Sequence, residues 1–484
     1  MYKKVKYEII MGLEVHVELS TKTKIFCSCK TNFGADPNTQ CCPVCTGMPG
    51  TLPVLNKKVL EYAVKAGVAL NCNITRYNKF DRKNYFYPDL PKAYQISQLY
   101  LPFATNGSIE ITTPSGANKN IRIFEIHMEE DAGKLIHSPV LNATLTDYNR
   151  CGVPLLEIVS YPDFRSTEEV IAYLEKLKTT FEYLGISDCK MQEGSMRVDV
   201  NLSVRPYGTE EYGTRTEMKN LNSFKAIERA ISFESARQIM LLEGGERVVQ
   251  ETRRWDDSKG ESHSMRSKED AQDYRYFPEP DIPPIIISQE MIDDIKNNQP
   301  EFADQKIKRY VNDFGLSRAD AEIIASSKYI AKLFEDTISL CNEPKEVRYW
   351  IINQIMYIMN DKGILPENIT LSSRKFAEFV KIITDDRINR QTGKTVFEKM
   401  FFGTDDFDIE KYIKDNQLQQ VDDIQSIRKA ILEVFKANPN TVLQYKNGQT
   451  KVVGFFVGQV MKAMRGKAKP DTVNKIISEE LNKI

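Results

Sequence analysis

Three side chains capable of metal or proton chemistry share one face of the first predicted strand. Residues 11–19 read M-G-L-E-V-H-V-E-L, so that Glu14, His16 and Glu18 alternate with apolar residues. This period of two predicts a half-buried β-strand. Two carboxylates beside an imidazole can bind a divalent cation or transfer a proton. A solvated acidic sheet face is the alternative, and this stretch alone does not separate the two interpretations.

A second predicted strand ends in acids of the same kind. Residues 121–133 alternate at first and then run through His127, Glu129, Glu130 and Asp131. Three consecutive carboxylates cannot share one strand face, so we expect the chain to turn there. Their mutual repulsion favours a bound cation, whereas an acidic turn in water is the alternative.

Glu157 stands alone in an otherwise apolar predicted strand within residues 147–160. A buried carboxylate needs a partner. A metal shared with Glu14, His16 and Glu130 would supply one, and a salt bridge is the alternative.

Two close cysteine pairs indicate a zinc site. Cys27 and Cys29 are followed, after a short spacer, by Cys42 and Cys45, and turn-forming Pro and Gly residues surround the second pair. Four thiolates at such spacings can close a tetrahedral structural zinc site. Cys41 adjoins Cys42, which leaves the identity of one ligand open, although Cys42 has the usual C-x-x-C spacing. Free cytosolic thiols are the alternative interpretation.

A loop rich in aromatic and basic residues follows at positions 81–97. Arg82, Lys83 and Lys92 can contact phosphate, and the tyrosines between them can stack on a base. Two prolines exclude a helix. The alternative is an aromatic surface loop that packs on a neighbouring element.

The elements that must position these residues form a polar-faced sheet backed by helices. Strands are predicted at residues 196–205 and 214–220, each with one charged face, and helices at 166–183 and 224–243. Such a sheet fits a working surface that is covered by helices on its other side.

Length and composition limit the class of protein. The 484 residues predict two to four domains, at about 100–200 residues each. The chain has a net charge of −1, 41% hydrophobic residues and no apolar run of membrane-spanning length. The N-terminus lacks a signal-peptide pattern, and the nine cysteines are odd in number and mostly scattered. We therefore expect a cytoplasmic protein without a disulfide framework.

The hydrophobic period changes after a proline cluster that ends at Pro284. From about residue 297 the spacing is helical, with a second small helical unit after about residue 405. These changes predict three domains, at residues 1–295, 296–404 and 405–484.

The last predicted domain holds a local basic patch. Residues 442–470 contain no Asp or Glu and include the following cations: Lys446, Lys451, Lys462, Arg465, Lys467 and Lys469. In a nearly neutral chain such a patch suits an RNA backbone, and a solvated face is the alternative.

Taken together, these motifs resemble one family. They include M-G-L-E-V-H-V-E-L, C-P-V-C-T-G-M-P-G, D-R-K-N-Y-F-Y-P-D-L-P-K-A-Y-Q, H-M-E-E-D-A-G-K, P-L-L-E-I-V-S and D-Y-R-Y-F-P-E-P-D. The chain resembles, from about Tyr7 to its end, the B subunits of bacterial aspartyl/glutamyl-tRNA(Asn/Gln) amidotransferases, the GatB family. The resemblance implies an α+β fold: a catalytic cradle domain with an antiparallel sheet like that of glutamine synthetase and guanido kinases, then an all-α helical domain and a small all-α tail that binds tRNA.

The resemblance also implies an activity. A protein of this family binds ATP and Mg²⁺, phosphorylates the side-chain carboxylate of Asp-tRNA(Asn) or Glu-tRNA(Gln), and aminates it for protein biosynthesis. The ammonia comes from a glutaminase A subunit, and a small C subunit completes the heterotrimer.

By motif, the family's metal ligands fall on Glu14, His16, Glu130 and Glu157, and Lys83 belongs to the same site, with Arg82 beside it for the nucleotide. Because imidazole is an uncommon Mg²⁺ ligand, two possibilities stay open: His16 binds one of two ions, or Mn²⁺ substitutes. A structural Zn²⁺ is expected on Cys27, Cys29, Cys42 and Cys45.

Two other hypotheses compete with this one. The chain can be a non-catalytic, zinc-containing tRNA-binding scaffold of the same complex, in which case Glu14 and Glu130 are dispensable for amidation. It can also be the archaeal-type paralogue, but that type has a large insertion before the helical domain, and none is visible here.

Overall fold

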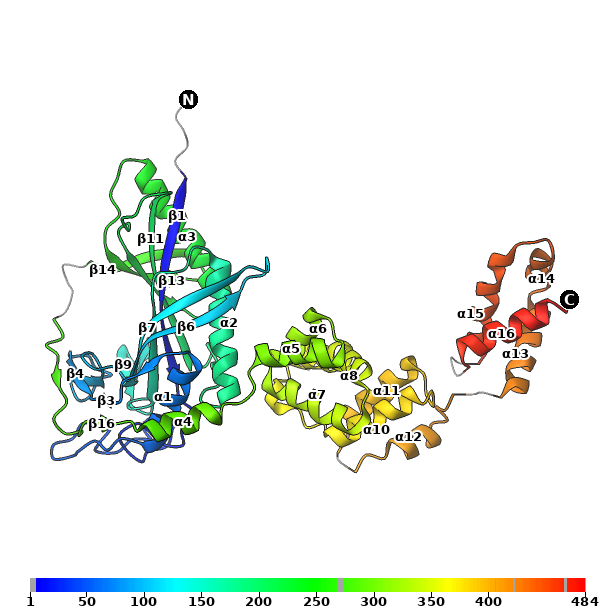
Figure 1. The fold of residues 1–484 in the computed structure, drawn as a ribbon, viewed down its shortest axis with the longest axis horizontal. Helices are drawn as coiled ribbons and strands as arrows, with labels where there is room; N and C mark the ends of the chain where they lie inside the picture. Colours follow the sequence, from blue (N-terminus) through cyan, green and yellow to red (C-terminus); the bar gives the residue numbers. More distant parts are fainter. Residues whose placement is uncertain (1–5, 268–272, 405, 421–422, 465–467, 484) are drawn as a thin grey trace. The chain divides into compact units, whose positions relative to one another are not determined.

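The computed structural model describes residues 6–267, 273–404, 406–420, 423–464 and 468–483, without the side chains of residues 266 and 267. The chain divides into two compact units, Met1–Phe302 and Ala303–Ile484. The first combines a large sheet with helices and the second is helical (Figure 1). The mixed α and β composition predicted from the sequence is confirmed. The likeness to glutamine synthetase and guanido kinases and the three-domain division stay predictions.

Nine strands of the described chain form one sheet in the first unit, in the order β14-β13-β12-β11-β1-β10-β7-β6-β2. Their bounds in chain order are β1 Tyr7–Glu18, β2 Asn73–Ile74, β6 Ala104–Thr112, β7 Asn118–Glu130, β10 Pro154–Ser160, β11 Met196–Pro206, β12 Thr216–Leu221, β13 Glu251–Asp256 and β14 Glu261–Ser267. The strand with the M-G-L-E-V-H-V-E-L motif thus lies inside the sheet, between β10 and β11.

The sheet is antiparallel except at one pairing. Strands β12 and β13 run parallel, with Glu217 opposite Thr252. Parallel neighbours need a long crossover, and helix α3 (Phe224–Glu243) supplies it. The expectation of an antiparallel sheet therefore needs this one correction.

Helices cover the apolar face of the sheet (Figure 1). They are α1 (Lys57–Ala69), α2 (Thr167–Leu184) and α3, while α4 (Gln289–Asn297), near the end of the unit, packs on α1. The alternating Leu13, Val15 and Val17 of β1 are fully buried in this core. Ser166 caps α2 by accepting a hydrogen bond from the amide of Glu169, as the sequence predicts. Since the apolar side chains face the helices, the alternate polar side chains face the other way.

Three small sheets are also present in the described part of the first unit. β15 (Phe277–Pro278), β4 (Asp81–Asn84) and β5 (Tyr94–Ser97) form one of them. β16 (Ile285–Ile286) pairs with β3 (Tyr77–Asn78), and β8 (Lys134–Ser138) pairs with β9 (Ala143–Asp147).

The described part of the second unit contains helices and no strand. They are α5 Ala303–Phe314, α6 Arg318–Ala325, α7 Lys328–Cys341, α8 Pro344–Trp350, η2 Ile351–Ile355, α9 Met356–Lys362, η3 Pro366–Asn368, α10 Ser373–Thr384, α11 Arg390–Phe401, α12 Ile409–Asp415, α13 Ile424–Ala437, α14 Pro439–Lys446, η4 Thr450–Val452, α15 Val453–Ala463 and α16 Pro470–Leu481. Helices α13, α15 and α16 bury a small core of their own around Phe435, Phe456 and Ile477.

The predicted basic patch lies in this helical unit. Lys446 and Lys451 are exposed and Lys462 lies at the end of α15, whereas Arg465 and Lys467 lie outside the described residues. No helix in the described ranges is both long enough and apolar enough to cross a bilayer.

Candidate functional site

A row of polar side chains crosses the centre of the large sheet. His16 on β1 lies opposite Glu157 on β10, and Glu157 lies opposite His127 on β7. On its other side His16 lies opposite Arg197 of β11. Side chains at paired positions project from the same face, so the register of four strands brings these residues together.

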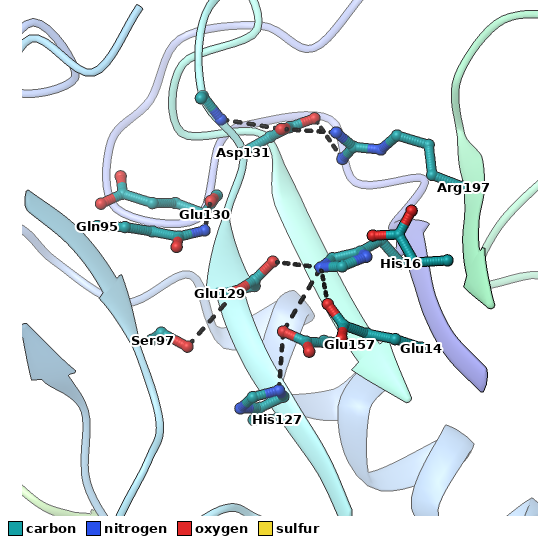
Figure 2. A network of polar contacts seen from close by, with 12 residues as sticks. Glu14, His16, Gln95, Ser97, His127, Glu129, Glu130, Asp131, Glu157 and Arg197 are labelled. Carbon is teal, nitrogen blue, oxygen red and sulfur yellow. Dashed lines mark hydrogen bonds and ion pairs between the residues drawn. The ribbon is translucent and has the colours of Figure 1, made fainter. Parts of the chain in front are cut away.

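The imidazole of His16 lies at the centre of an acidic cluster (Figure 2). Its Nε2 atom is 3.3 Å from Glu129, 3.5 Å from Glu157 and 3.9 Å from Glu14, measured to the nearest carboxylate oxygen. The second histidine, His127, places its Nε2 atom 2.9 Å from Glu157 and its Nδ1 atom 2.7 Å from the carbonyl oxygen of Gln98. We call Glu14, His16, His127, Glu129 and Glu157 the acid–histidine cluster.

The geometry of this cluster fits a metal ion. Glu14, His16 and Glu157 each offer a ligand atom, and these three atoms lie within 4.8 Å of one another. Carboxylate oxygens with one imidazole suit Mn²⁺ fully and Mg²⁺ in part, since Mg²⁺ prefers an all-oxygen shell.

The electrostatics of the cluster favour a positive charge at its centre. Burial and then the nearby Glu157 carboxylate raise the pKa of Glu14 to about 7. Burial lowers the pKa of His16, but hydrogen bonds to Glu129 and Glu157 outweigh it and hold that pKa well above the usual value. A proton on His16 thus neutralises the acids, and a divalent cation would take over that role.

Glu130, predicted as a ligand, lies outside the cluster. Its carboxylate contacts the ammonium of Lys92 and accepts a hydrogen bond of 2.9 Å from the amide of Ile96, and Figure 2 shows it pointing away from His16. Strand β7 continues through Glu130 and ends before Asp131, so the chain leaves the strand only at the last of the three acids. Neighbours on a strand face opposite sides, so Glu129 occupies the place expected for Glu130. The alternation that starts at His127 is the signal in the sequence that identifies Glu129.

Glu18, the third acid of β1, is half-buried and not part of a solvated face. Burial and then the neighbouring Asp131 carboxylate raise the pKa of Glu18 to about 8. Asp131 itself is held by Arg197, with 2.7 Å between Nη2 and Oδ2. Asp131 and Arg197 lie next to the acid–histidine cluster (Figure 2).

Lys83 and Arg82 project to opposite sides of β4. Lys83 lies opposite Gln95 in the β4–β5 pairing, and Ser97, on the same face of β5, donates a hydrogen bond to Glu129, so Lys83 projects from the face of this small sheet that is turned toward Glu129. Burial lowers the pKa of Lys83, but the charges of Glu129, Tyr276 and Glu157 raise it above the usual value. Arg82 instead forms ion pairs of 2.6 Å with Glu279 and 2.8 Å with Asp281. The two predicted nucleotide contacts are therefore not side by side: Lys83 faces the cluster, and Arg82 faces carboxylates that occupy its guanidinium.

The four predicted zinc ligands meet at one point. The Sγ atoms of Cys27, Cys29, Cys42 and Cys45 lie within 4.8 Å of one another, and four thiolates at such spacing fit a tetrahedral zinc. Cys41 lies apart, 3.7 Å from the Oδ1 atom of Asn149. The geometry thus favours Cys42 over Cys41. All nine cysteines, each of them described, are free of disulfides.

Comparison with known proteins identifies the family. The model of the GatB/GatE catalytic domain matches residues 9–293, and that of the GatB domain matches residues 332–481. The chain belongs to the GatB/GatE family. Its catalytic-domain match contains all members of the acid–histidine cluster and the four clustered cysteines.

Relatives in this family align over almost the whole chain. A protein of Lachnoclostridium phytofermentans is 58% identical over 477 residues, which cover 99% of each chain. A protein of Caldicellulosiruptor bescii is 55% identical over 482 residues, covering 99% of this chain and 100% of the relative. Both relatives carry the name of the B subunit of aspartyl/glutamyl-tRNA(Asn/Gln) amidotransferase.

Proposed function

We propose that this chain is the B subunit of an ATP-dependent tRNA amidotransferase, which converts Asp-tRNA(Asn) or Glu-tRNA(Gln) into Asn-tRNA(Asn) or Gln-tRNA(Gln). The observation that carries the proposal is the acid–histidine cluster with Lys83 beside it, in a family whose relatives bear that name. A metal-capable acid cluster next to a lysine is the arrangement that phosphoryl transfer requires.

The reaction begins with activation of a poor electrophile. A carboxylate oxygen of the aminoacyl side chain attacks the γ-phosphorus of ATP, and ADP leaves. Ammonia then attacks the carbonyl carbon of the acyl phosphate, and inorganic phosphate leaves with the electrons of the C–O bond. Both steps bring anions together, so neutralisation of charge is the main task of the site.

Each residue has a role in that task. Glu14, His16, Glu129 and Glu157 would hold one or two divalent cations, which lower the repulsion between the γ-phosphate and the attacking carboxylate. His127 orients Glu157 through their 2.9 Å contact. No described residue forms an ion pair with Lys83, so its ammonium can meet a phosphate oxygen.

The other parts of the chain serve the complex. Ammonia would come from the amidase A subunit, with a small C subunit completing a heterotrimer in the cytoplasm. Lys446, Lys451 and Lys462 suit the tRNA backbone. The cysteine cluster would bind a structural Zn²⁺, because four thiolates leave no position open for a substrate.

The test uses the chain assembled with its A and C partners. Asp-tRNA(Asn) or Glu-tRNA(Gln) is supplied with ATP, Mg²⁺ and glutamine, and ADP and the amidated aminoacyl-tRNA are measured. ADP release that depends on the misacylated tRNA supports the proposal. The absence of ADP with both tRNAs contradicts it. If Glu14→Gln amidates as fast as the unchanged complex, the non-catalytic scaffold is the better description.

A further inference from the structure

The segment Asp273–Asp281 runs antiparallel beside β4 and brings the ring of Tyr274 over Lys83. We call these residues the strap. Tyr274 and Arg275 offer their carbonyl oxygens to Asn84, which donates from its backbone amide at 2.9 Å and from its side-chain amide at 2.8 Å. Farther on, Phe277 pairs with Arg82 in the small β15–β4 sheet. The strap is thus fastened along the whole length of β4.

One tyrosine of the strap lies over the Lys83 ammonium, and two further tyrosines pack against its ring. Lys83 Nζ lies 5.0 Å from the centre of the Tyr274 ring, which in turn contacts the rings of Tyr276 and Tyr85 edge to face. A cation over an aromatic face is attracted by the ring quadrupole. These rings therefore restrict the long, flexible side chain of Lys83 to the side of β4 that faces Glu129 and Glu157.

A single arginine on the other side of β4 holds the far end of the strap. Arg82 donates two hydrogen bonds to Glu279, of 2.6 and 3.0 Å, and a third, of 2.8 Å, to Asp281. The Glu279 side chain has no exposed surface, and the Arg82 guanidinium also lies 4.2 Å from the ring centre of Tyr94. All of this fixes the guanidinium away from the cluster.

The ion pairs of Arg82 also constrain Lys83, the next residue in the strand. Arg82 and Lys83 are consecutive residues of one strand. The hydrogen bonds of Arg82 to Glu279 and Asp281 therefore fix the orientation of the β4 backbone, and with it the direction in which Lys83 projects. Arg275 has a φ of 45°, which is unfavourable for a side chain with a Cβ and shows that the strap is held in place by its contacts.

We propose that Arg82 is a positioning residue: through Glu279 and Asp281 it holds the strap so that Tyr274 and Tyr276 aim Lys83 at the acid–histidine cluster. This assigns Arg82 to the organisation of the site and not to nucleotide contact. The catalytic consequence rests on the proposed function, whereas the effect on Lys83 does not.

The structural test is acetylation of Lys83 in the full-length chain, followed by mass spectrometry. Arg82→Met and Glu279→Gln should both raise the labelling rate of Lys83 several-fold, because the aromatic cover loosens. Arg122→Met is the matched control: Arg122 also binds a carboxylate, Asp163, with two side-chain hydrogen bonds and lies over a tyrosine ring, but it belongs to β7 and not to the small sheet that holds Lys83. Unchanged labelling in both strap variants overturns the proposal. Should Arg82→Met fail to fold, Glu279→Gln and Asp281→Asn decide it.

The kinetic test uses the assembled complex. A positioning role predicts that Arg82→Met and Glu279→Gln each lower kcat for ADP release about 10²-fold, as for a misplaced catalytic group, with little change in KM for ATP. The double variant should lower kcat no further than either single variant does, since both substitutions break the same ion pair between Arg82 and Glu279. A large rise in KM for ATP in Arg82→Met alone would mean direct nucleotide binding and overturn the proposal. If the unchanged complex releases no ADP, the proposed function fails, and the labelling result still decides the role of the strap.

Discussion

The carboxylate of Glu129 lies 3.3 Å from Nε2 of His16, although the two residues are 113 positions apart in the chain. Strands β7 and β1 are not neighbours, because β10 lies between them. The contact therefore spans three strands, and it brings Glu129 to the point at which Glu14 and Glu157 also converge.

The first prediction separates Glu129 from its neighbour Glu130. We expect Glu129→Gln to weaken Mn²⁺ binding at least tenfold, because it removes a charged group beside His16. Glu130→Gln should leave Mn²⁺ binding nearly unchanged, since its carboxylate contacts Lys92. Titration of the purified chain with Mn²⁺, followed by electron paramagnetic resonance, measures both affinities. The opposite order of effects would restore Glu130 as the ligand.

The second prediction concerns pH. The pKa of Glu14, raised to about 7, means that a proton competes with the metal below this pH. Mn²⁺ affinity should therefore rise with pH through about 7, by up to tenfold per pH unit for this one group. His16, whose pKa is also raised, must release its proton as well before it can bind the metal. The rise of Mn²⁺ affinity therefore continues above pH 7.

Binding of Mn²⁺ should consequently release protons. Isothermal titration at pH 7 in two buffers of different ionisation enthalpy measures how many. Glu14→Gln should release fewer protons than the unchanged chain. An affinity that is flat from pH 6 to pH 8 would contradict the prediction.

The third prediction tests the zinc ligands. Cys42→Ser should lose bound zinc and destabilise the first unit by several kcal/mol, because a structural zinc site contributes directly to folding. Cys41→Ser is the control, since Cys41 lies outside the group of four. Zinc content by mass spectrometry and thermal unfolding report the two effects. Equal zinc content in both variants would exclude Cys42 as a ligand.

The fourth prediction concerns the lysines near the end of the chain. Changing Lys446, Lys451 and Lys462 together to Gln should weaken tRNA binding and lower the slope of log affinity against log salt by about 2–3, at somewhat under one per phosphate contact. Glutamine hydrolysis by the assembled complex should stay unaffected. Lys332, an exposed lysine paired with Asp336 on α7, offers a control site. An unchanged salt slope would count against this patch as a phosphate contact.

The strands and helices that position the site were predicted well from the sequence. The identity of the residues that form the site was predicted less well. Alternation around Glu14 and His16 determines which side chains share a face, and α3 begins and ends where its periodicity predicts. The choice between Glu129 and Glu130 depends on whether β7 stays extended to its last residue, which the acidic run does not reveal. Likewise, nothing near Arg82 in the sequence shows that its partner, Glu279, arrives from almost 200 positions away.

Strand β1 lies at the centre of the sheet, and this placement affects how the protein folds during synthesis. The neighbours of β1 begin only at Pro154 and Met196, so its two edges stay unpaired until the ribosome has made β10 and β11. At about 5–20 residues per second this interval lasts roughly 10–40 s. During this time a strand with one apolar face and two open edges is a substrate for chaperones and a template for aggregation. Glu14 and His16, two of the residues that would hold the metal, therefore lie on a strand that waits for both of its native neighbours on the nascent chain.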